Sequence, residues 1–177
     1  MTVINPSDGV SAKKLLEQAV AMEGPCYVRL GRAKVPVFYE DSDQLTLGRG
    51  NLVRDGKDVT IVATGIMVSE AMAAAEKLKE DGIDARIIDI HTIKPIDEEI
   101  IVKAASETKA IITAEEHSVI GGLGAAVAEV VVKKCPVKMA MVGQKDTYGE
   151  SGKPDELKKK YGMTAEDIEA AVKNLIG

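Results

Sequence analysis

Short apolar runs alternate with amphipathic stretches along most of the chain, which predicts buried strands followed by helices. The apolar runs typical of buried strands lie at residues 59–65, 84–90, 110–116 and 137–143. Stretches with apolar residues at helical spacing lie at residues 67–82, 97–109, 124–134, 155–162 and 165–177. Strands that alternate with helices usually form a parallel sheet with helices on both faces. Residues 58–177 are therefore predicted to form a complete three-layer α/β/α domain around a mostly parallel sheet.

Residues 1–32 show the same alternation but are too few for a complete domain. The two strand-like runs and the amphipathic helical pattern between them lie at residues 1–5, 26–31 and 11–22. Such a unit leaves one face and one edge of its sheet uncovered. Either another chain covers it, or the sequence is the C-terminal portion of a longer protein. Residues 33–57 contain prolines, glycines and mixed charges, and are expected to form a linker with a short strand near residues 44–47.

Composition narrows the class of protein. The net charge of -5 and the lack of basic runs interleaved with aromatic residues argue against nucleic-acid binding. No apolar run reaches membrane-spanning length, and the N-terminus does not have the pattern of a secretion signal. Cys26 and Cys135 stand alone, without the spacing of a zinc site. We therefore expect a cytoplasmic protein with reduced thiols, no membrane segment and no metal of its own.

Two arginines are candidates for ligand binding. Arg32 is expected just beyond the end of the strand at residues 26–31, where ligands gather in open α/β sheets. Its guanidinium suits a phosphate or a carboxylate, but from spacing alone a salt bridge to the linker is the favoured interpretation. Arg29 falls inside the same strand, where a structural ion pair beneath the linker is the simpler interpretation. A supporting role in a binding site is the alternative for Arg29.

A glycine-rich turn follows the strand at residues 110–116. The strand ends in Glu115, Glu116 and His117, and the turn before the next helix contains Gly121, Gly122 and Gly124. Such a turn can bind an anion at a helix N-terminus, or it can serve only to make a sharp turn and bring helix and sheet close together. His117 suits a general acid or base, or a supporting hydrogen-bond donor, although single histidines are often structural. The adjacent glutamates point to opposite faces of the strand, so they do not act as a catalytic pair.

The segment from Asp89 to Asp97 raises the question of a metal site. Asp89 and His91 have the spacing of a ligand pair, and Lys94 follows them. A loop that contains Pro95 and ends in a helix cap at Asp97 explains the segment without a metal. We predict the structural role and no metal ligand here.

The motifs GPCYVRLGR, DIHTIKPID and AEEHSVIGGLGAAVAE, together with the order of elements after Asp58, resemble the C-terminal section of the transketolase family of thiamine diphosphate enzymes. The resemblance covers nearly the whole chain. It implies that residues 1–32 are the end of a pyrimidine-binding domain and that residues 58–177 are the family's C-terminal domain. Deoxyxylulose phosphate synthase and the β subunits of 2-oxo acid dehydrogenases belong to the same group and remain alternatives. A dimerisation module without catalysis is an alternative of another class, and a nucleotide-binding domain is a more distant one.

The resemblance also implies a division of labour. The family's GDG motif with its downstream Asn, and the glutamate that activates the cofactor, are not found in this sequence. The intact enzyme is thus expected to use thiamine diphosphate and Mg²⁺ to move a two-carbon ketol unit between sugar phosphates. This chain alone is expected to be inactive, to contribute no catalytic residue, and to require an N-terminal transketolase section within a homodimer. Met1 resembles an internal family position, so we expect a fragment to start there.

By the same resemblance, Arg32 corresponds to the family's arginine that binds the terminal phosphate of the substrate. Arg29, His117 and the three glycines of the turn are left with a supporting role. The expected phosphate contact would explain why an arginine stands at the end of the second strand.

Overall fold

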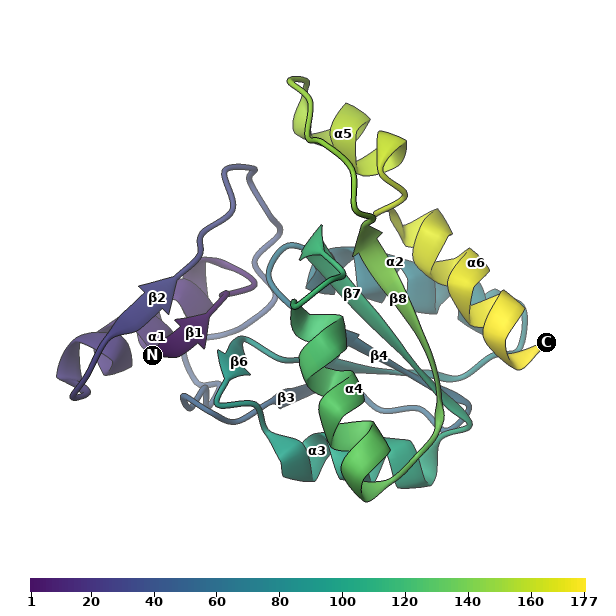
Figure 1. Ribbon diagram of the computed structural model, residues 1–177, viewed down its shortest axis with the longest axis horizontal. Coiled ribbons are helices and arrows are strands. Elements are labelled where there is room, and N and C mark those ends of the chain that lie inside the picture. Colours follow the sequence, from purple (N-terminus) through teal and green to yellow (C-terminus); the bar gives the residue numbers. More distant parts are fainter.

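The computed structural model describes residues 1–177 and shows an α/β protein with two sheets (Figure 1). The larger sheet has five strands in the order β3-β5-β4-β7-β8. In that order they are Asn51–Arg54, Ala85–Asp89, Val59–Ala63, Ala110–Ser118 and Lys138–Gln144. β4, β5, β7 and β8 pair in parallel, whereas β3 pairs antiparallel with β5. The predicted mostly parallel sheet is confirmed.

Helices cover both faces of this sheet, which confirms the three-layer arrangement. α2 (Met67–Glu80) and α6 (Ala165–Ile176) pack on one face, while α3 (Glu98–Glu107) and α4 (Leu123–Lys134) pack on the other. Successive residues of β4 point to alternate faces, so Ile61 lies in the first apolar core and Val62 in the second. No helix is both long and apolar enough to cross a membrane.

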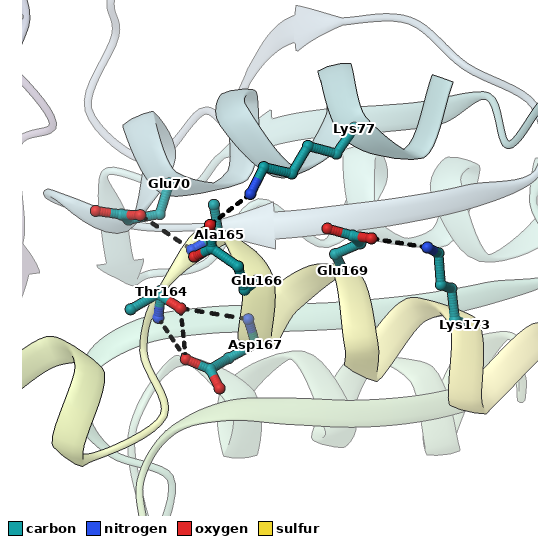
Figure 2. Close-up of polar contacts among 8 residues, drawn as sticks. All are labelled: Glu70, Lys77, Thr164, Ala165, Glu166, Asp167, Glu169 and Lys173. Carbon is teal, nitrogen blue, oxygen red and sulfur yellow. Dashed lines mark hydrogen bonds and ion pairs between the residues drawn. The ribbon is translucent and has the colours of Figure 1, made fainter. Parts of the chain in front are cut away.

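Local signals set the ends of several helices. Asp97 caps α3 by accepting from the backbone N–H groups of Glu99 and Ile100, as the sequence predicted. Thr164 and Asp167 form the predicted reciprocal capping box at the start of α6, which Figure 2 shows. Gly82 follows α2 with a φ of +79°, a left-handed conformation that glycine adopts without steric cost.

Polar contacts hold both C-terminal helices against α2, and Figure 2 shows those made by α6. The carboxylate of Glu70 accepts a hydrogen bond from the backbone N–H of Ala165 at 3.0 Å. The same carboxylate accepts from Nζ of Lys158 on α5 (Pro154–Lys160) at 2.6 Å. Lys77 and Glu166 form a further ion pair between α2 and α6. These contacts join the end of the chain to the centre of the domain.

The smaller sheet joins residues 1–32, called the N-terminal unit below, to the larger domain that contains the five-stranded sheet. Its order is β2-β1-β6, with β1 at Thr2–Ile4, β2 at Cys26–Val28 and β6 at Thr92–Lys94. α1 (Gly9–Ala21) connects β1 to β2, so the predicted strand, helix and strand unit is present. β6 lies in the segment that we expected to be a loop, and it pairs antiparallel with β1. The loop prediction was wrong for these residues, because their partner strand is about 90 residues away and leaves no local signal.

The expected linker also contains a strand in a different place. Residues 44–47 form no strand, and β3 at Asn51–Arg54 pairs with β5 instead. β3 thus adds an antiparallel edge to the larger sheet from within the predicted linker at residues 33–57. The sequence pattern misses β3 because an exposed edge strand of four residues carries a weak apolar alternation.

Candidate functional site

β2 ends at Val28, earlier than predicted, so Arg29 lies just after the strand and not inside it, and Arg32 follows a few residues beyond the carboxyl end of β2. The residue is exposed, and its guanidinium makes no hydrogen bond or ion pair within the chain. The salt bridge to the linker, which was the simpler alternative, is not formed. Immediately before it, Gly31 passes so close to the start of α2 that an added Cβ would lie 2.9 Å from Cγ2 of Ile66. Arg32 is therefore an exposed cation without a partner in the chain, beyond the carboxyl end of the parallel pair β1 and β2.

Arg29 is used differently. Its Nη2 donates to the backbone oxygen of Glu116 at 2.7 Å and lies 3.8 Å from Oε2 of the same residue. The ion-pair interpretation of Arg29 thus fits the structure, although the partner lies on β7 and not beneath the linker. The contact connects the N-terminal unit to the larger domain.

Glu115 occupies the anion position of the glycine-rich turn. The residue is 1% exposed, and its carboxylate accepts from the backbone N–H of Leu123 at 2.7 Å and of Gly124 at 2.8 Å. These are first-turn amides of α4, which need an acceptor and carry the positive end of the helix dipole. The turn therefore binds an anion, but that anion is the protein's own carboxylate. The sequence analysis missed the signal, which is a glutamate in the preceding strand, eight residues before the first residue of the helix.

The glycines of the turn fit this close arrangement. A Cβ on Gly122 would lie 2.0 Å from Oε2 of Glu115, and one on Gly124 would lie 2.7 Å from Sδ of Met141. Gly121 has a φ of +73°, in the left-handed region that favours glycine. These features agree with the interpretation of the glycines as residues for a sharp turn and close helix packing.

A cavity of about 660 Å³ lies between the smaller sheet and α4, in the size range of small-molecule sites. Four of the predicted supporting residues line it, namely Arg29, His117, Gly121 and Gly122. Neither Gly124 nor Arg32 is among the lining residues. His117 is exposed, and its Nδ1 lies 3.1 Å from the backbone oxygen of Ser118. The structure thus brings most of the supporting residues together but separates them from the arginine at the strand end.

A buried polar cluster connects the two sheets, and sequence reasoning did not identify it. Asp89 at the end of β5 is fully buried, and its Oδ2 accepts from Oγ of Ser7 at 2.6 Å and from the hydroxyl of Tyr39 at 3.0 Å. Burial raises the pKa of the Asp89 carboxyl to about 7. A second carboxylate nearby, that of Asp8, adds to this effect.

Asp8 holds both the start of α1 and the beginning of the connecting segment. Its Oδ1 accepts from the backbone N–H of Ser11, and its Oδ2 accepts from those of Phe38 and Tyr39, each at 3.0 Å. Burial works against its charge, but these hydrogen bonds lower the pKa of Asp8 below its ordinary value. Asp8 is therefore a charged clamp on a chain segment 30 residues away.

His91 has both ring nitrogens occupied within the protein. Nδ1 lies 3.0 Å from Oγ1 of Thr92 and Nε2 lies 3.2 Å from Oδ1 of Asn51, and the side chain is fully buried. Burial lowers the pKa of His91 to about 4, so the ring is neutral at physiological pH. The Asp89 carboxylate faces Ser7 and Tyr39, so the two residues do not form a ligand pair. No group of three or more His, Cys, Asp or Glu side chains is placed to hold a metal ion.

The family follows from comparison with known proteins. The model of the family "Transketolase, C-terminal domain" matches residues 48–168. The chain belongs to the transketolase C-terminal domain family. The resemblance in the sequence motifs is thereby confirmed, and the match spans all the strands of the larger sheet.

Two curated relatives are named as transketolase subunits. The chain is 47% identical over 168 residues to the 6-deoxy-6-sulfo-D-fructose transketolase subunit of Clostridium sp. (strain MSTE9), covering 95% of this chain and 52% of the relative. It is 43% identical over 169 residues to an apulose-4-phosphate transketolase subunit of Phocaeicola vulgatus, covering 95% of this chain and 54% of the relative. The chain thus spans about half the length of the curated relatives it matches.

The solved structure of a split-gene transketolase in an inactive β4 tetramer is similar throughout the chain. The TM-score is 0.96 at 46% identity, covering 99% of this chain and 58% of that chain. The likeness includes the N-terminal unit, and it agrees with the α/β fold of the transketolase C-terminal domain described above.

Proposed function

We propose that this chain is the C-terminal part of a transketolase that transfers a two-carbon ketol unit between sugar phosphates. The observation that carries the proposal is the match to named transketolase subunits over 95% of this chain. Because the chain spans only about half of those subunits, the rest of the subunit and an N-terminal section together complete the active site in this proposal. The chain by itself is inactive.

Thiamine diphosphate and Mg²⁺ belong to the partner section in this proposal. The residues present do not fit a metal site, since no group of three acidic, histidine or cysteine ligands comes together. When bound in the assembled enzyme, the cofactor supplies the covalent chemistry of ketol transfer. The contribution of this chain is to bind and orient the substrate and to support the assembly.

Arg32 is the residue that we propose to bind the terminal phosphate of the sugar. Three features support this role: its position at a strand end, its exposure and its lack of an internal partner. A guanidinium matches the geometry of a phosphate with two parallel hydrogen bonds. Such a charge-assisted contact is worth about 1.5–3 kcal/mol. Arg29 and Glu115 already have protein partners, and they serve to hold the surrounding elements.

The N-terminal unit is the surface that we propose for the partner section. Its exposed apolar side chains include Val20 at 86%, Tyr27 at 52% and Leu30 at 59%. Strand β2 is the edge of its sheet, so its outer backbone groups lack a partner strand. The assembled protein is proposed to be a cytoplasmic dimer of such pairs. The related structure named as a β4 tetramer gives four copies of one chain as the alternative state for the isolated section.

Reconstitution tests this proposal. The chain is joined to the half of a related subunit that it does not span and mixed with an N-terminal section from a split transketolase, thiamine diphosphate and Mg²⁺. Ketol transfer from a ketose phosphate to an aldose phosphate is then measured. Each section alone is the control, and a sulfo-ketose donor is included because one relative is named for such a sugar. Transfer by the mixture and by neither section supports the proposal. Transfer by the chain alone contradicts it, as does assembly that decarboxylates a 2-oxo acid without ketol transfer.

A further inference from the structure

We infer that Asp89 is a positioning residue for substrate binding, because it holds, through the hydroxyl of Tyr39, the chain segment that carries Arg32. This segment, residues 32–37, is called the arginine segment below. The inference rests on the proposed role of Arg32 in binding the terminal phosphate. The larger domain contributes no residue to the proposed phosphate contact. Through Asp89 it nevertheless affects that contact.

The arginine segment has no hydrogen bonds of its own. Its backbone forms neither helix nor strand, and most of its residues are exposed. Its upstream end is fixed where the backbone N–H of Arg29 donates to the backbone oxygen of Ile4 at 2.8 Å. Its downstream end is fixed where Phe38 and Tyr39 donate to Asp8. A segment without internal bonds takes its course from its two ends, so these anchors decide where Arg32 lies.

The downstream anchor is tied to an inner strand of the larger sheet. Asp89 lies on β5, which is paired on one side with β3 and on the other with β4. Its Oδ2 accepts from Tyr39 at 3.0 Å and from Ser7 at 2.6 Å, and all three side chains are buried. Ser7 immediately precedes Asp8, whose carboxylate accepts from the backbone N–H of Tyr39. Asp89 therefore binds Tyr39 directly and also binds the residue next to Asp8. The start of α1, the connecting segment and the larger sheet therefore meet at one carboxylate.

A carboxylate at position 89 indicates that the side chain orients its hydrogen-bond partners and does not merely fill space. Full burial of such a group costs free energy, which hydrogen bonds offset only in part. Oδ1 of Asp89 has no hydrogen-bond partner, so the carboxylate is only half satisfied. An apolar side chain would fill the same volume without that cost. What the carboxylate adds is the directional contact to the hydroxyls of Ser7 and Tyr39.

The first test is Tyr39→Phe in the reconstituted enzyme. This variant removes the hydroxyl and keeps the aromatic ring. We expect KM for phosphorylated ketose donors to rise about 2- to 10-fold, the effect of losing one net hydrogen bond, with kcat and the KM for unphosphorylated donors unchanged. Tyr148→Phe is the matched control, because Tyr148 is 97% exposed and its hydroxyl has no partner. An equal change for both donor types overturns the inference.

A double variant tests whether Tyr39 acts through Arg32. In the Arg32→Ala background, Tyr39→Phe should raise KM for phosphorylated donors no further, because the contact that it positions is already lost. Full additivity of the two effects overturns the inference. Asp89→Asn keeps an oxygen that accepts the Tyr39 hydroxyl, and it should retain near wild-type KM, whereas Asp89→Leu should behave like Tyr39→Phe. If Asp89→Leu does not fold, Tyr39→Phe still decides the question.

Hydrogen exchange separates this inference from the proposed function. In Tyr39→Phe, the amides of Phe38 and Tyr39 should exchange faster than in wild type, while those of β4 should not change. Unchanged exchange at these amides overturns the inference whatever the kinetics. If exchange accelerates but Arg32→Ala does not affect phosphorylated donors, the anchor stands and the proposed phosphate contact fails.

Discussion

Asp89 and His91 lie on either side of Ile90 at the end of β5, both fully buried, and their pKa values are shifted in opposite directions. Burial raises the pKa of Asp89 from 3.8 to about 7 and lowers that of His91 from 6.5 to about 4. In each case burial favours the neutral form. The folded protein therefore carries a proton on Asp89 over much of the range in which the unfolded chain carries one on His91.

The sign of each contribution to stability follows from these shifts. The contribution of Asp89 is fully present below its unfolded pKa of 3.8 and is lost as the pH rises through about 7. The contribution of His91 is present above 6.5 and is lost as the pH falls through about 4. Between about pH 4 and 6.5 the two slopes oppose each other, so together they leave little pH dependence.

In the Asp89→Asn variant, the pH dependence of stability that comes from His91 is expected to be no longer offset. The variant should lose stability relative to wild type as the pH falls from about 6.5 to 4, by an amount on the order of 3 kcal/mol over the window. Chemical denaturation at several pH values measures this, and Asp146→Asn, an exposed residue without a partner, is the control. The complementary variant His91→Gln should become more stable on acidification over the same window. If the stability of Asp89→Asn changes with pH in parallel with that of wild type, the opposing contributions of Asp89 and His91 are refuted.

Glu115 gives a prediction on stability alone. Glu115→Ala leaves the amides of Leu123 and Gly124 buried without an acceptor and opens a small cavity. We expect a loss of about 2–4 kcal/mol in the free energy of unfolding. The control is Glu116→Gln on the adjacent, half-exposed position, where a loss below about 1 kcal/mol is expected. Equal losses at both positions, measured by urea denaturation, would argue against the capping role of Glu115.

Local chemistry explains how much of this arrangement could be predicted from sequence. The caps at Asp97 and at Thr164 were predictable because cap and helix are adjacent in the chain. The Glu115 cap uses the same chemistry, but its carboxylate comes from the preceding strand, and no spacing rule covers that case. Strand β6 and its partner β1 are far apart in sequence, so no short window contains the signal.

In the candidate site too, the features set by neighbouring residues were predictable from sequence, and those set by distant residues were not. The apolar run before Arg32 predicts a strand ahead of it, but β2 ends earlier, at Val28. That Arg32 lacks a partner can be seen only in the folded chain. The contact between Tyr39 and Asp89 spans 50 residues and joins two units that sequence patterns treat separately. Apolar periodicity does not reveal such a contact, because a buried aspartate in a strand departs from the pattern that defines the strand.

Gly122 tests the close packing of the turn. An added Cβ would lie 2.0 Å from Oε2 of Glu115, so Gly122→Ala must displace the carboxylate that caps α4. We expect a loss of about 1–3 kcal/mol in the free energy of unfolding. Gly149→Ala is a matched control, since a Cβ there would meet nothing within 4 Å. A thermal denaturation scan in which both variants melt with wild type would show that the turn has room to relax.

Arg32→Ala tests the proposed phosphate contact in the reconstituted enzyme. Loss of a charge-assisted contact of about 1.5–3 kcal/mol should raise KM for phosphorylated donors roughly 10- to 100-fold and leave unphosphorylated donors unaffected. Lys34→Ala is the matched control, because Lys34 is a second exposed cation in the arginine segment without a partner. Its removal should change KM little if the contact depends on the guanidinium at position 32. Arg32→Lys should recover only part of the affinity, because an ammonium lacks the paired donors that match a phosphate. Steady-state kinetics with both donor types decide the matter, and equal losses on both would mean that Arg32 supports the fold of the site without contacting the phosphate.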